Sequence, residues 1–358
     1  MNANPPRIRV LLVDDSALAL ELLRRMLATA PDMDVVGTAS SGQEALQRVL
    51  ELQPQVVCTD YHMPGMNGLE LTREIMARAP RPVLVISDSL QPDQRDNIFS
   101  MLEAGALDVL AKPQGSQDMH YAAMAAELLQ KIRVLSGVRV FRRWPLSTPV
   151  ATASVVDEPL VPQRGPRRAV RVVGLGASTG GPQALERVLR ALPRNWPVPV
   201  LCVQHIAPGF VNGLATWLGK CCALPVCIAQ TGQTPEPGVV YLAADGLHLD
   251  LDAQGRMLLS DAAPVSGHRP SVNVLFEALA RHYGDAAAGV LLTGMGRDGA
   301  QGLLALHRAG GYTIAQDEAS SVVYGMPGHA RDLGAADAVL PLDQIGPVLR
   351  NLLGEKTR

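Results

Sequence analysis

Short apolar runs that stop at a polar residue recur along this chain, and segments of helical length separate them. In the first third of the chain, the run at residues 10–13 is followed by two aspartates, and later runs end at Asp60, Ser87 and Lys112. Apolar runs of strand length that alternate with helical segments predict a parallel sheet covered by helices. Ligands bind outside the carboxyl ends of such strands, so we expect these polar side chains to meet at one edge of the sheet.

The same pattern returns in the second half of the chain. A strand-like run at residues 171–177 enters a glycine-rich turn with Ser178, and a helical segment with Pro182 in its first turn follows. Proline is tolerated there because the first helical N–H groups have no partner within the helix. Two further runs end at His205 and at a glycine-rich turn that carries Asp298. The second half therefore predicts a second parallel sheet.

A proline-rich stretch separates the two patterns. Residues 136–168 contain five prolines and follow neither the helical nor the strand period, which is typical of a semi-rigid spacer. We therefore predict a first domain at residues 7–125, a helix end and proline-rich linker at 126–168, and a second domain at 169–353.

The composition narrows the class of protein. With 358 residues, of which 47% are hydrophobic, the chain can build two sizeable cores. A net charge of -2 argues against a nucleic-acid-binding surface, which needs a basic face. We find no signal peptide and no run long enough for a membrane span, so we expect a cytoplasmic protein without membrane insertion. The five cysteines lack paired C-x-x-C spacing and predict neither disulfides nor a zinc site.

The polar strand ends of the first domain suit phosphoryl transfer. Asp14, Asp15 and Asp60 offer oxygen ligands to a hard divalent cation, and Asp60 is placed to attack phosphorus. Lys112 would balance the charge on the phosphoryl oxygens, and Ser87 adds a hydroxyl. Acidic residues after strands are also ordinary loop solvation, but three separate elements with suitable residue types favour a real site.

Further motifs surround these residues. The sequence Met-Pro-Gly-Met-Asn-Gly follows Asp60 at residues 63–68, and Pro113 follows Lys112. With these motifs, residues 7 to about 125 resemble a two-component receiver domain. The resemblance implies a flavodoxin-like fold, phosphorylation of Asp60 by a partner histidine kinase, and Mg²⁺ as the cofactor of that reaction.

The glycine-rich turn of the second domain suits two chemistries. A dinucleotide-binding fingerprint needs a third glycine, but Thr179 stands there after Gly174 and Gly176. Residues 176–180, Gly-Ala-Ser-Thr-Gly, instead fit the G-x-S-x-G pattern, in which a sharp turn exposes a serine nucleophile. Taken alone, this motif also fits a tight turn whose serine has no catalytic role.

A serine nucleophile needs a base, and the base needs an acid that orients it. His205 and Asp298 end strands as Ser178 does, so we expect the three to form a triad. Their order along the chain is not that of α/β-hydrolases, but a triad is defined by geometry. Five other histidines lie in alternating, helical or loop segments and are expected to be surface or packing residues: His248, His268, His282, His307 and His329.

Several motifs of the second half then match one family. They are Gly176–Gly181, Val203–His205, His268–Val272, Leu292–Gly299 and Ala315–Pro327. With them, residues from about 170 to 353 resemble the catalytic domain of the chemotaxis protein-glutamate methylesterases (CheB family), which also carry an N-terminal receiver and a linker. The resemblance implies an α/β chain of two doubly wound parallel-sheet domains, the first flavodoxin-like and the second Rossmann-like.

The family resemblance also implies roles for single residues. Ser178 would be the nucleophile, His205 the general base, and Asp298 the residue that orients the imidazole. Met295 would donate to the oxyanion, and Thr179 would support the nucleophile. The implied reaction is hydrolysis of γ-glutamyl methyl esters on methyl-accepting chemoreceptors, with no cofactor for the ester chemistry. Whether receptor glutamines are also deamidated is left open.

Three positions depart from the family patterns. Val109 stands where receivers usually have an aromatic residue, and Asn67 and Asn273 stand where aspartate is common. We expect Asn67 and Asn273 to leave the chemistry intact and Val109 to alter the relay from phosphate to surface. Two other classes of protein are alternatives to an esterase, a signalling module with a degenerate second domain and a nucleotide-dependent oxidoreductase. The complete set of triad residues argues against the first, and the missing third glycine argues against the second.

Overall fold

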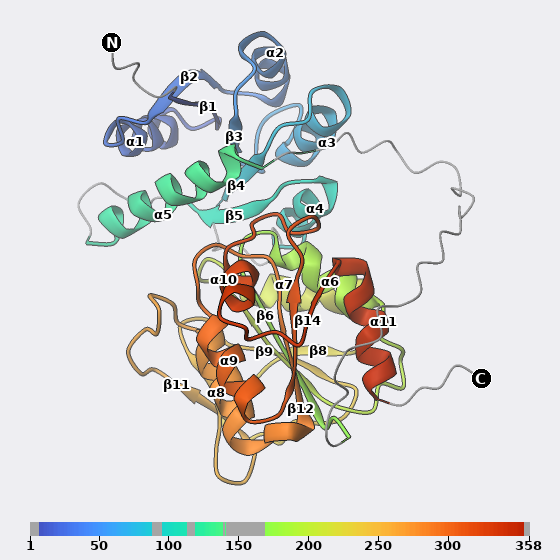
Figure 1. Cartoon of the computed structure of the whole chain (residues 1–358). Helices are drawn as coiled ribbons and strands as arrows, with labels where there is room; N and C mark the ends of the chain where they lie inside the picture. The colour runs from blue at the N-terminus through green and yellow to red at the C-terminus, as the bar shows by residue number, and fades with distance from the viewer. Residues whose placement is uncertain (1–6, 88–94, 113–118, 139, 141–168, 354–358) are drawn as a thin grey trace. The chain divides into compact units, whose positions relative to one another are not determined.

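The computed structural model describes residues 7–87, 95–112, 119–138, 140 and 169–353. The chain forms two compact units that divide after residue 151 (Figure 1). Most of the predicted linker, residues 141–168, lies outside the described residues, as does Pro113. Within the described part of the chain, none of the helices has both the length and the apolar character that a membrane crossing requires.

The N-terminal unit is a five-stranded parallel sheet in the order β2-β1-β3-β4-β5. Its strands are β1 (Ile8–Val13), β2 (Met33–Ala39), β3 (Val56–Thr59), β4 (Val83–Ser87) and β5 (Asp108–Ala111). Its helices are α1 (Ala17–Ala28), α2 (Gly42–Leu52), α3 (Gly68–Arg78), α4 (Arg95–Ala104) and α5 (Met119–Ser136). Helices α1 and α5 contact each other, and α2, α3 and α4 form a separate row (Figure 1). Because helices cover both faces, the central strands are continuous apolar runs.

Local sequence signals start these helices. The side chains of Ser16 and Ser41 accept hydrogen bonds from the first turns of α1 and α2. Asn67 accepts from the N–H of Glu70 at the start of α3, and the Glu70 side chain accepts from the N–H of Asn67 in return. This capping box explains why asparagine serves at position 67.

The C-terminal unit has a seven-stranded sheet in the order β14-β13-β12-β6-β7-β9-β8, in which every pairing is parallel. The strands are β6 (Val172–Ala177), β7 (Val200–Gln204), β8 (Val226–Ile228), β9 (Val240–Leu242), β12 (Ala287–Leu291), β13 (Tyr312–Gln316) and β14 (Ala338–Leu340). A separate antiparallel hairpin joins β10 (His248–Leu251) to β11 (Met257–Ser260).

Helices flank this second sheet. They are α6 (Gly181–Arg190), α7 (Val211–Cys221), α8 (Val272–His282), α9 (Ala300–Arg308), α10 (Met326–Asp332) and α11 (Leu342–Leu352), with a short 3₁₀ turn, η2, at Gly284–Ala286. Helices α8 and α9 pack together against β6 and β12, and α6 packs with α7 and α11. The prediction of two doubly wound parallel-sheet α/β folds is confirmed.

The strand order places the candidate sites. In the first sheet, β1 has β2 on one side and β3 on the other, and in the second sheet β6 has β7 on one side and β12 on the other. The connections leave in opposite directions at these points, so a crevice opens at the carboxyl ends of the strands. Residues that follow β1 and β3, or β6, β7 and β12, therefore come together although they are far apart in sequence.

Candidate functional sites

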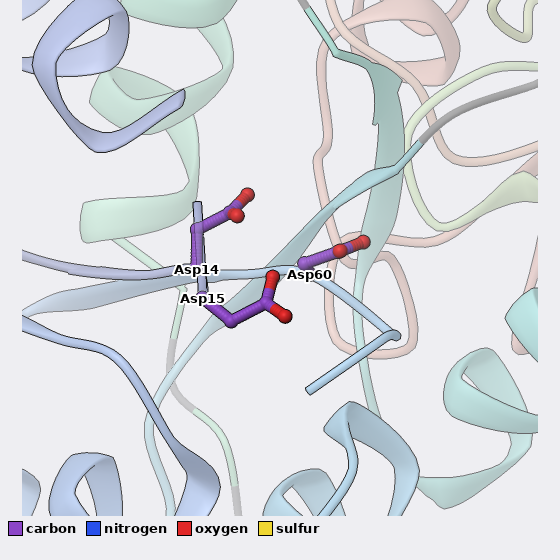
Figure 2. Close-up of side chains that lie close together, drawn as sticks. All are labelled: Asp14, Asp15 and Asp60. Atoms are coloured by element: carbon purple, nitrogen blue, oxygen red, sulfur yellow. The ribbon is translucent and has the colours of Figure 1, made fainter. Parts of the chain in front are cut away.

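In the N-terminal unit, the three predicted aspartates lie together (Figure 2). One carboxylate oxygen from each of Asp14, Asp15 and Asp60 lies within 4.8 Å of the others. Asp14 and Asp15 follow β1 and Asp60 follows its parallel neighbour β3. Asp14 and Asp60 are buried, whereas Asp15 is exposed. An all-oxygen group with one open side fits a small hard cation that keeps some of its waters.

Lys112 closes this cluster. Its Nζ lies 2.8 Å from Oδ2 of Asp14 and 2.7 Å from Oδ2 of Asp60. Burial raises the pKa of the Asp14 carboxyl, and the contacts with Lys112 and the N–H of Ser16 offset only part of that effect. Burial alone would lower the pKa of Lys112, but the two carboxylates outweigh it and raise the pKa. The ammonium is therefore charged at neutral pH, and the site favours added positive charge.

Two other residues singled out in this unit, Ser87 and Val109, lie on β4 and β5. Ser87 is the last residue of β4, is buried, and its carbonyl oxygen accepts the N–H of Lys112 at 3.1 Å. Val109 lies within β5 and is 1% exposed, so it is a core residue rather than a side chain that reports to the surface.

In the C-terminal unit, Ser178 lies between the end of β6 and the start of α6. Its N–H donates to the carbonyl of Thr293 at 3.0 Å, and its carbonyl accepts from the N–H of Gly181 at 2.7 Å. Gly180 in this turn has a φ of 74°, in the left-handed region that glycine adopts without strain. The serine is thus fixed by its backbone at the amino end of a helix, which favours developing negative charge.

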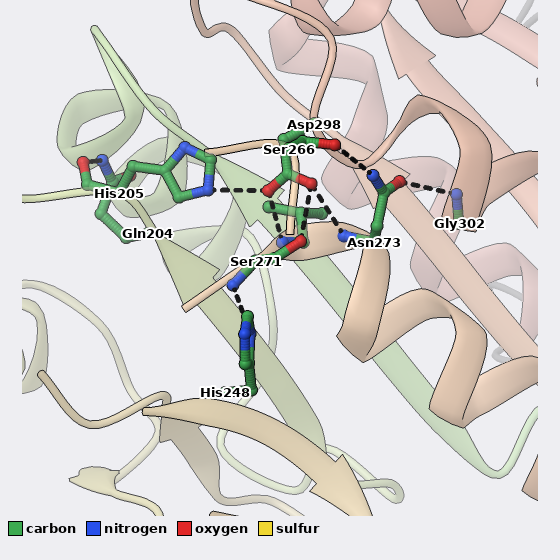
Figure 3. A network of polar contacts seen from close by, with 9 residues as sticks. Gln204, His205, His248, Ser266, Ser271, Asn273, Asp298 and Gly302 are labelled. Atoms are coloured by element: carbon green, nitrogen blue, oxygen red, sulfur yellow. Dashed lines mark hydrogen bonds and ion pairs between the residues drawn. The ribbon is translucent and has the colours of Figure 1, made fainter. Parts of the chain in front are cut away.

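His205 and Asp298 meet across the crevice (Figure 3). Nε2 of His205 lies 2.9 Å from Oδ2 of Asp298, and the buried Nδ1 atom of His205 has no hydrogen-bond partner among the residues that the structure describes. Burial alone would raise the pKa of Asp298, but its hydrogen bonds with His205, Ser271 and the N–H of Val272 hold that pKa below its ordinary value. An ionised carboxylate only accepts, so Nε2 carries a proton, and in the neutral imidazole Nδ1 then keeps its lone pair.

Helix α8 holds the carboxylate of Asp298 in place (Figure 3). Oδ1 accepts from the hydroxyl of Ser271 at 2.7 Å and the N–H of Asn273 at 3.3 Å, and Oδ2 accepts from the N–H of Val272 at 2.7 Å. These donors belong to the start of the helix, where N–H groups have no partner within the helix. The carboxylate of Asp298 therefore caps α8 with both oxygens and orients His205 with Oδ2.

Thr293 joins Ser178 to the turn that carries Met295. The hydroxyl of Thr293 donates to the carbonyl of Thr179 at 3.0 Å and accepts the N–H of Val323 at 2.9 Å. The N–H of Thr293 donates to Oε1 of Gln316 at 2.8 Å and the N–H of Gly294 to the carbonyl of Val323 at 3.0 Å. In the described part of the chain, the N–H of Met295 donates to no acceptor.

Sequence reasoning missed several residues that build this site. The ring of His268 stacks on the ring of His205 with centroids 3.9 Å apart and an angle of 6°, although a loop position had suggested a surface or packing role. His248 is buried, and its Nδ1 accepts the N–H of Ser271 at 3.2 Å. Nε2 of Gln204 donates to the carbonyls of Ser178 and His205 at 2.8 and 2.7 Å. Gln204 and His268 both lie in motifs of the family resemblance, and Gln204 also directly precedes a polar strand end, whereas His248 has neither signal.

Two family models match the two units of the chain. The CheB methylesterase family model matches residues 173–349, and the response regulator receiver domain model matches residues 10–124. A Nitrosospira multiformis protein named protein-glutamate methylesterase/protein-glutamine glutaminase is 43% identical over 350 residues, 98% of each chain. A Myxococcus xanthus protein with the same name, numbered 4, is 45% identical over 338 residues, 94% of this chain and 95% of that one.

A solved structure is similar to the C-terminal unit. The crystal structure of the Thermotoga maritima CheB methylesterase catalytic domain is 37% identical, with a TM-score of 0.50. The match covers 52% of this chain and 100% of that domain.

Proposed function

This chain belongs to the protein-glutamate methylesterase family, and from that premise we propose that it hydrolyses γ-glutamyl methyl esters on chemoreceptors through Ser178. The observation that carries the proposal is the pair formed by His205 and Asp298, with Nε2 held at 2.9 Å from Oδ2 and Nδ1 left without a partner in the described part of the chain. That arrangement leaves one basic nitrogen at the end of the strand beside β6, whose turn carries Ser178.

The chemistry follows from these groups. As Oγ of Ser178 attacks the ester carbonyl, its proton passes to Nδ1 of His205, and Asp298 stabilises the resulting imidazolium. The imidazolium then protonates the departing methoxide, so methanol leaves and an ester to Ser178 remains. Water deprotonated by His205 hydrolyses that ester and restores a receptor carboxylate. Glutamine amides share this acyl-transfer path, and the names of the relatives include protein-glutamine glutaminase.

The oxyanion site rests on backbone donors. The N–H groups of Thr293 and Gly294 donate to Gln316 and Val323, whereas that of Met295, the next residue, has no acceptor among the described residues. Because Gly294 packs directly on Ser178, this turn lies against the nucleophile. Thr179 begins the first turn toward α6, and its carbonyl is fixed by Thr293, so it supports the nucleophile from the other side.

The N-terminal unit would act as the phosphorylation switch of the enzyme. Asp14, Asp15 and Asp60 would hold Mg²⁺, which fits their oxygen-only donor set and the raised pKa of Asp14. When bound, Mg²⁺ neutralises charge on the phosphoryl group. Asp60 would accept the phosphoryl group from a chemotaxis histidine kinase, and Lys112 would pair with the product. Because the methylated receptor helices are cytoplasmic, we place the chain in the cytoplasm.

Active-site labelling tests the esterase proposal without any receptor. A fluorophosphonate probe should label wild-type protein and fail to label Ser178→Ala, and labelling of His205→Ala should be slower by orders of magnitude. Ser16→Ala, which changes a serine in the other unit, is the matched control. Labelling that persists in a folded Ser178→Ala protein would contradict the proposal.

Borohydride trapping tests the switch site separately. After reaction with acetyl phosphate, mass spectrometry should find the trapped product at Asp60, and only when Mg²⁺ is present. Modification at another residue, or without a divalent cation, would count against the proposed site.

A further inference from the structure

A tight two-residue hairpin turn stands beside the catalytic histidine. The N–H of Val265 donates to the carbonyl of His268 at 3.1 Å, and the N–H of His268 donates back to the carbonyl of Val265 at 3.0 Å. The two residues between them, Ser266 and Gly267, have φ values of 54° and 82°. Two consecutive positive φ values are the signature of a type I′ turn, which connects antiparallel strands closely.

Contacts with buried residues pin this turn and the segment before it. Nδ2 of Asn273 donates to Oγ of Ser266 at 3.2 Å, and Oδ1 of Asn273 accepts the N–H of Gly302 at 2.7 Å (Figure 3). Nε2 of His248 donates to the carbonyl of Ala263 at 3.1 Å. A non-glycine residue with a positive φ persists only when its surroundings enforce the conformation, and such positions gather at functional sites. The segment is therefore a fixed wall of the site.

This segment carries an exposed apolar side chain, that of Val265. Val265 and His268 are opposite each other in an antiparallel pair, so their side chains share one face of the hairpin. On that face, the ring of His268 stacks on His205, whereas Val265 is 37% exposed. Every residue from 261 to 267 is exposed. Val265 is thus exposed to solvent on the same face of the hairpin as His268, which stacks on His205.

We propose that Val265 is a substrate-docking residue that packs against an apolar side chain of the receptor helix beside the methylated glutamate. The inference rests on the proposed function, because a glutamyl ester on a helix brings the helix surface to the rim of the site when it reaches Ser178. On a helix, residues three and four positions from the glutamate lie on the same face and would meet the rim. Val265 lies outside the reacting groups, so it selects substrate and takes no part in the chemistry.

The test compares Val265→Asp and Val265→Ala with Val339→Asp in the full chain saturated with acetyl phosphate and Mg²⁺. Val339 is the matched control because it is also a valine, also 37% exposed, and lies on β14, three strands away from β6. The substrate is membranes whose chemoreceptors carry tritiated methyl esters, and methanol release gives KM and kcat. Fluorophosphonate labelling of Ser178 reports the nucleophile without a docked helix, and thermal unfolding reports folding.

We expect Val265→Asp to raise KM at least about tenfold and Val265→Ala about two- to threefold. Loss of the apolar contacts of one side chain typically has effects of this size. Values of kcat and labelling rates should stay within about twofold of wild type, and Val339→Asp should match wild type throughout. The inference is overturned if Val265→Asp and Val265→Ala leave KM unchanged, or if Val265→Asp slows labelling as much as methanol release. If wild-type protein is labelled but releases no methanol from receptors, the proposed substrate fails and this inference fails with it.

Discussion

The hydroxyl of Ser271 donates a 2.7 Å hydrogen bond to Oδ1 of Asp298. The other oxygen of the same carboxylate faces Nε2 of His205 at 2.9 Å and accepts the N–H of Val272 at 2.7 Å. Ser271 itself is 0% exposed, and its N–H donates to His248. The start of α8 therefore sets the direction in which Asp298 holds the His205 imidazole.

Replacing Ser271 with alanine should weaken catalysis through Asp298. A hydrogen bond to a charged group contributes about 1.5–3 kcal/mol, so we expect kcat to fall roughly 10- to 100-fold while KM changes little. Ser271→Thr keeps the hydroxyl and should restore most of the rate. Steady-state methanol release measures both parameters. A Ser271→Ala protein with wild-type kcat, or a Ser271→Thr protein as impaired as Ser271→Ala, would contradict the positioning role.

Gly294→Ala should displace Ser178. A Cβ atom at this position would lie 2.7 Å from Cβ of Ser178 and would also collide with Sδ of Met326. A shift of about 1 Å in catalytic geometry can cost about 10²-fold in rate, and we expect a loss of that size in fluorophosphonate labelling. The control is Gly219→Ala in α7, where an added Cβ meets no atom within 4 Å.

Gly219→Ala should leave the labelling rate unchanged and raise the free energy of unfolding by about 0.5–1 kcal/mol, because alanine is the better helix former. Equal labelling rates for Gly294→Ala and wild type would show that the turn with Met295 does not press on Ser178.

Much of the site could be predicted because it lies at strand ends. Apolar runs fix where parallel strands stop, so Asp60, Ser178, His205 and Asp298 could be expected at two crevices from the sequence alone. The helix-capping role of Asp298 could not be predicted, because its partner Ser271 is 27 positions away and the two meet through the packing of α8 on β12 and α9.

His268 and His248 were missed for a similar reason. Neither ends a strand of the large sheet, and each reaches the site through the hairpin β10–β11 and the turn that follows it. Hairpin placement depends on the tertiary contacts of Asn273 and Ala263, which carry no pattern in the sequence.

Asp14→Asn should stabilise the N-terminal unit in the absence of divalent cations. The pKa of Asp14 is raised above its ordinary value of 3.8, chiefly by burial. Between pH 3.8 and that raised pKa the folded form binds more protons than the unfolded form, so stability falls as pH rises through this window. Asparagine removes the buried charge, and Lys112 keeps its contact with Asp60.

Thermal unfolding in EDTA at several pH values checks this expectation. The midpoint of the transition that responds to Mg²⁺ should rise by roughly 1–5 °C at neutral pH in Asp14→Asn, and its pH dependence should become flatter. The control Asp34→Asn changes an exposed aspartate of β2 and should leave the midpoint unchanged. A lower midpoint for Asp14→Asn would mean that its contact with Lys112 outweighs the cost of burial.

Removing the N-terminal unit should raise esterase activity. We expect the unphosphorylated receiver to inhibit the esterase, and a coupling of about 1–3 kcal/mol corresponds to a five- to hundredfold change in rate. A fragment that begins at Ala169 should exceed the unphosphorylated full chain by that factor and ignore acetyl phosphate. The catalytic domain of the Thermotoga maritima relative was crystallised on its own, so such a fragment is a reasonable protein to make. Equal rates for fragment and full chain, with no response to phosphorylation, would show that the receiver has another role.

Methanol release from tritium-methylated chemoreceptor membranes tests the central claim most directly. Phosphorylated wild-type protein should release methanol, whereas Ser178→Ala and His205→Ala should each be slower by about 10⁴-fold or more. When catalytic groups act as one unit, removing any one of them removes nearly all of the activity. Circular dichroism of the two variants controls for folding. A folded Ser178→Ala protein that releases methanol at close to the wild-type rate would contradict the account.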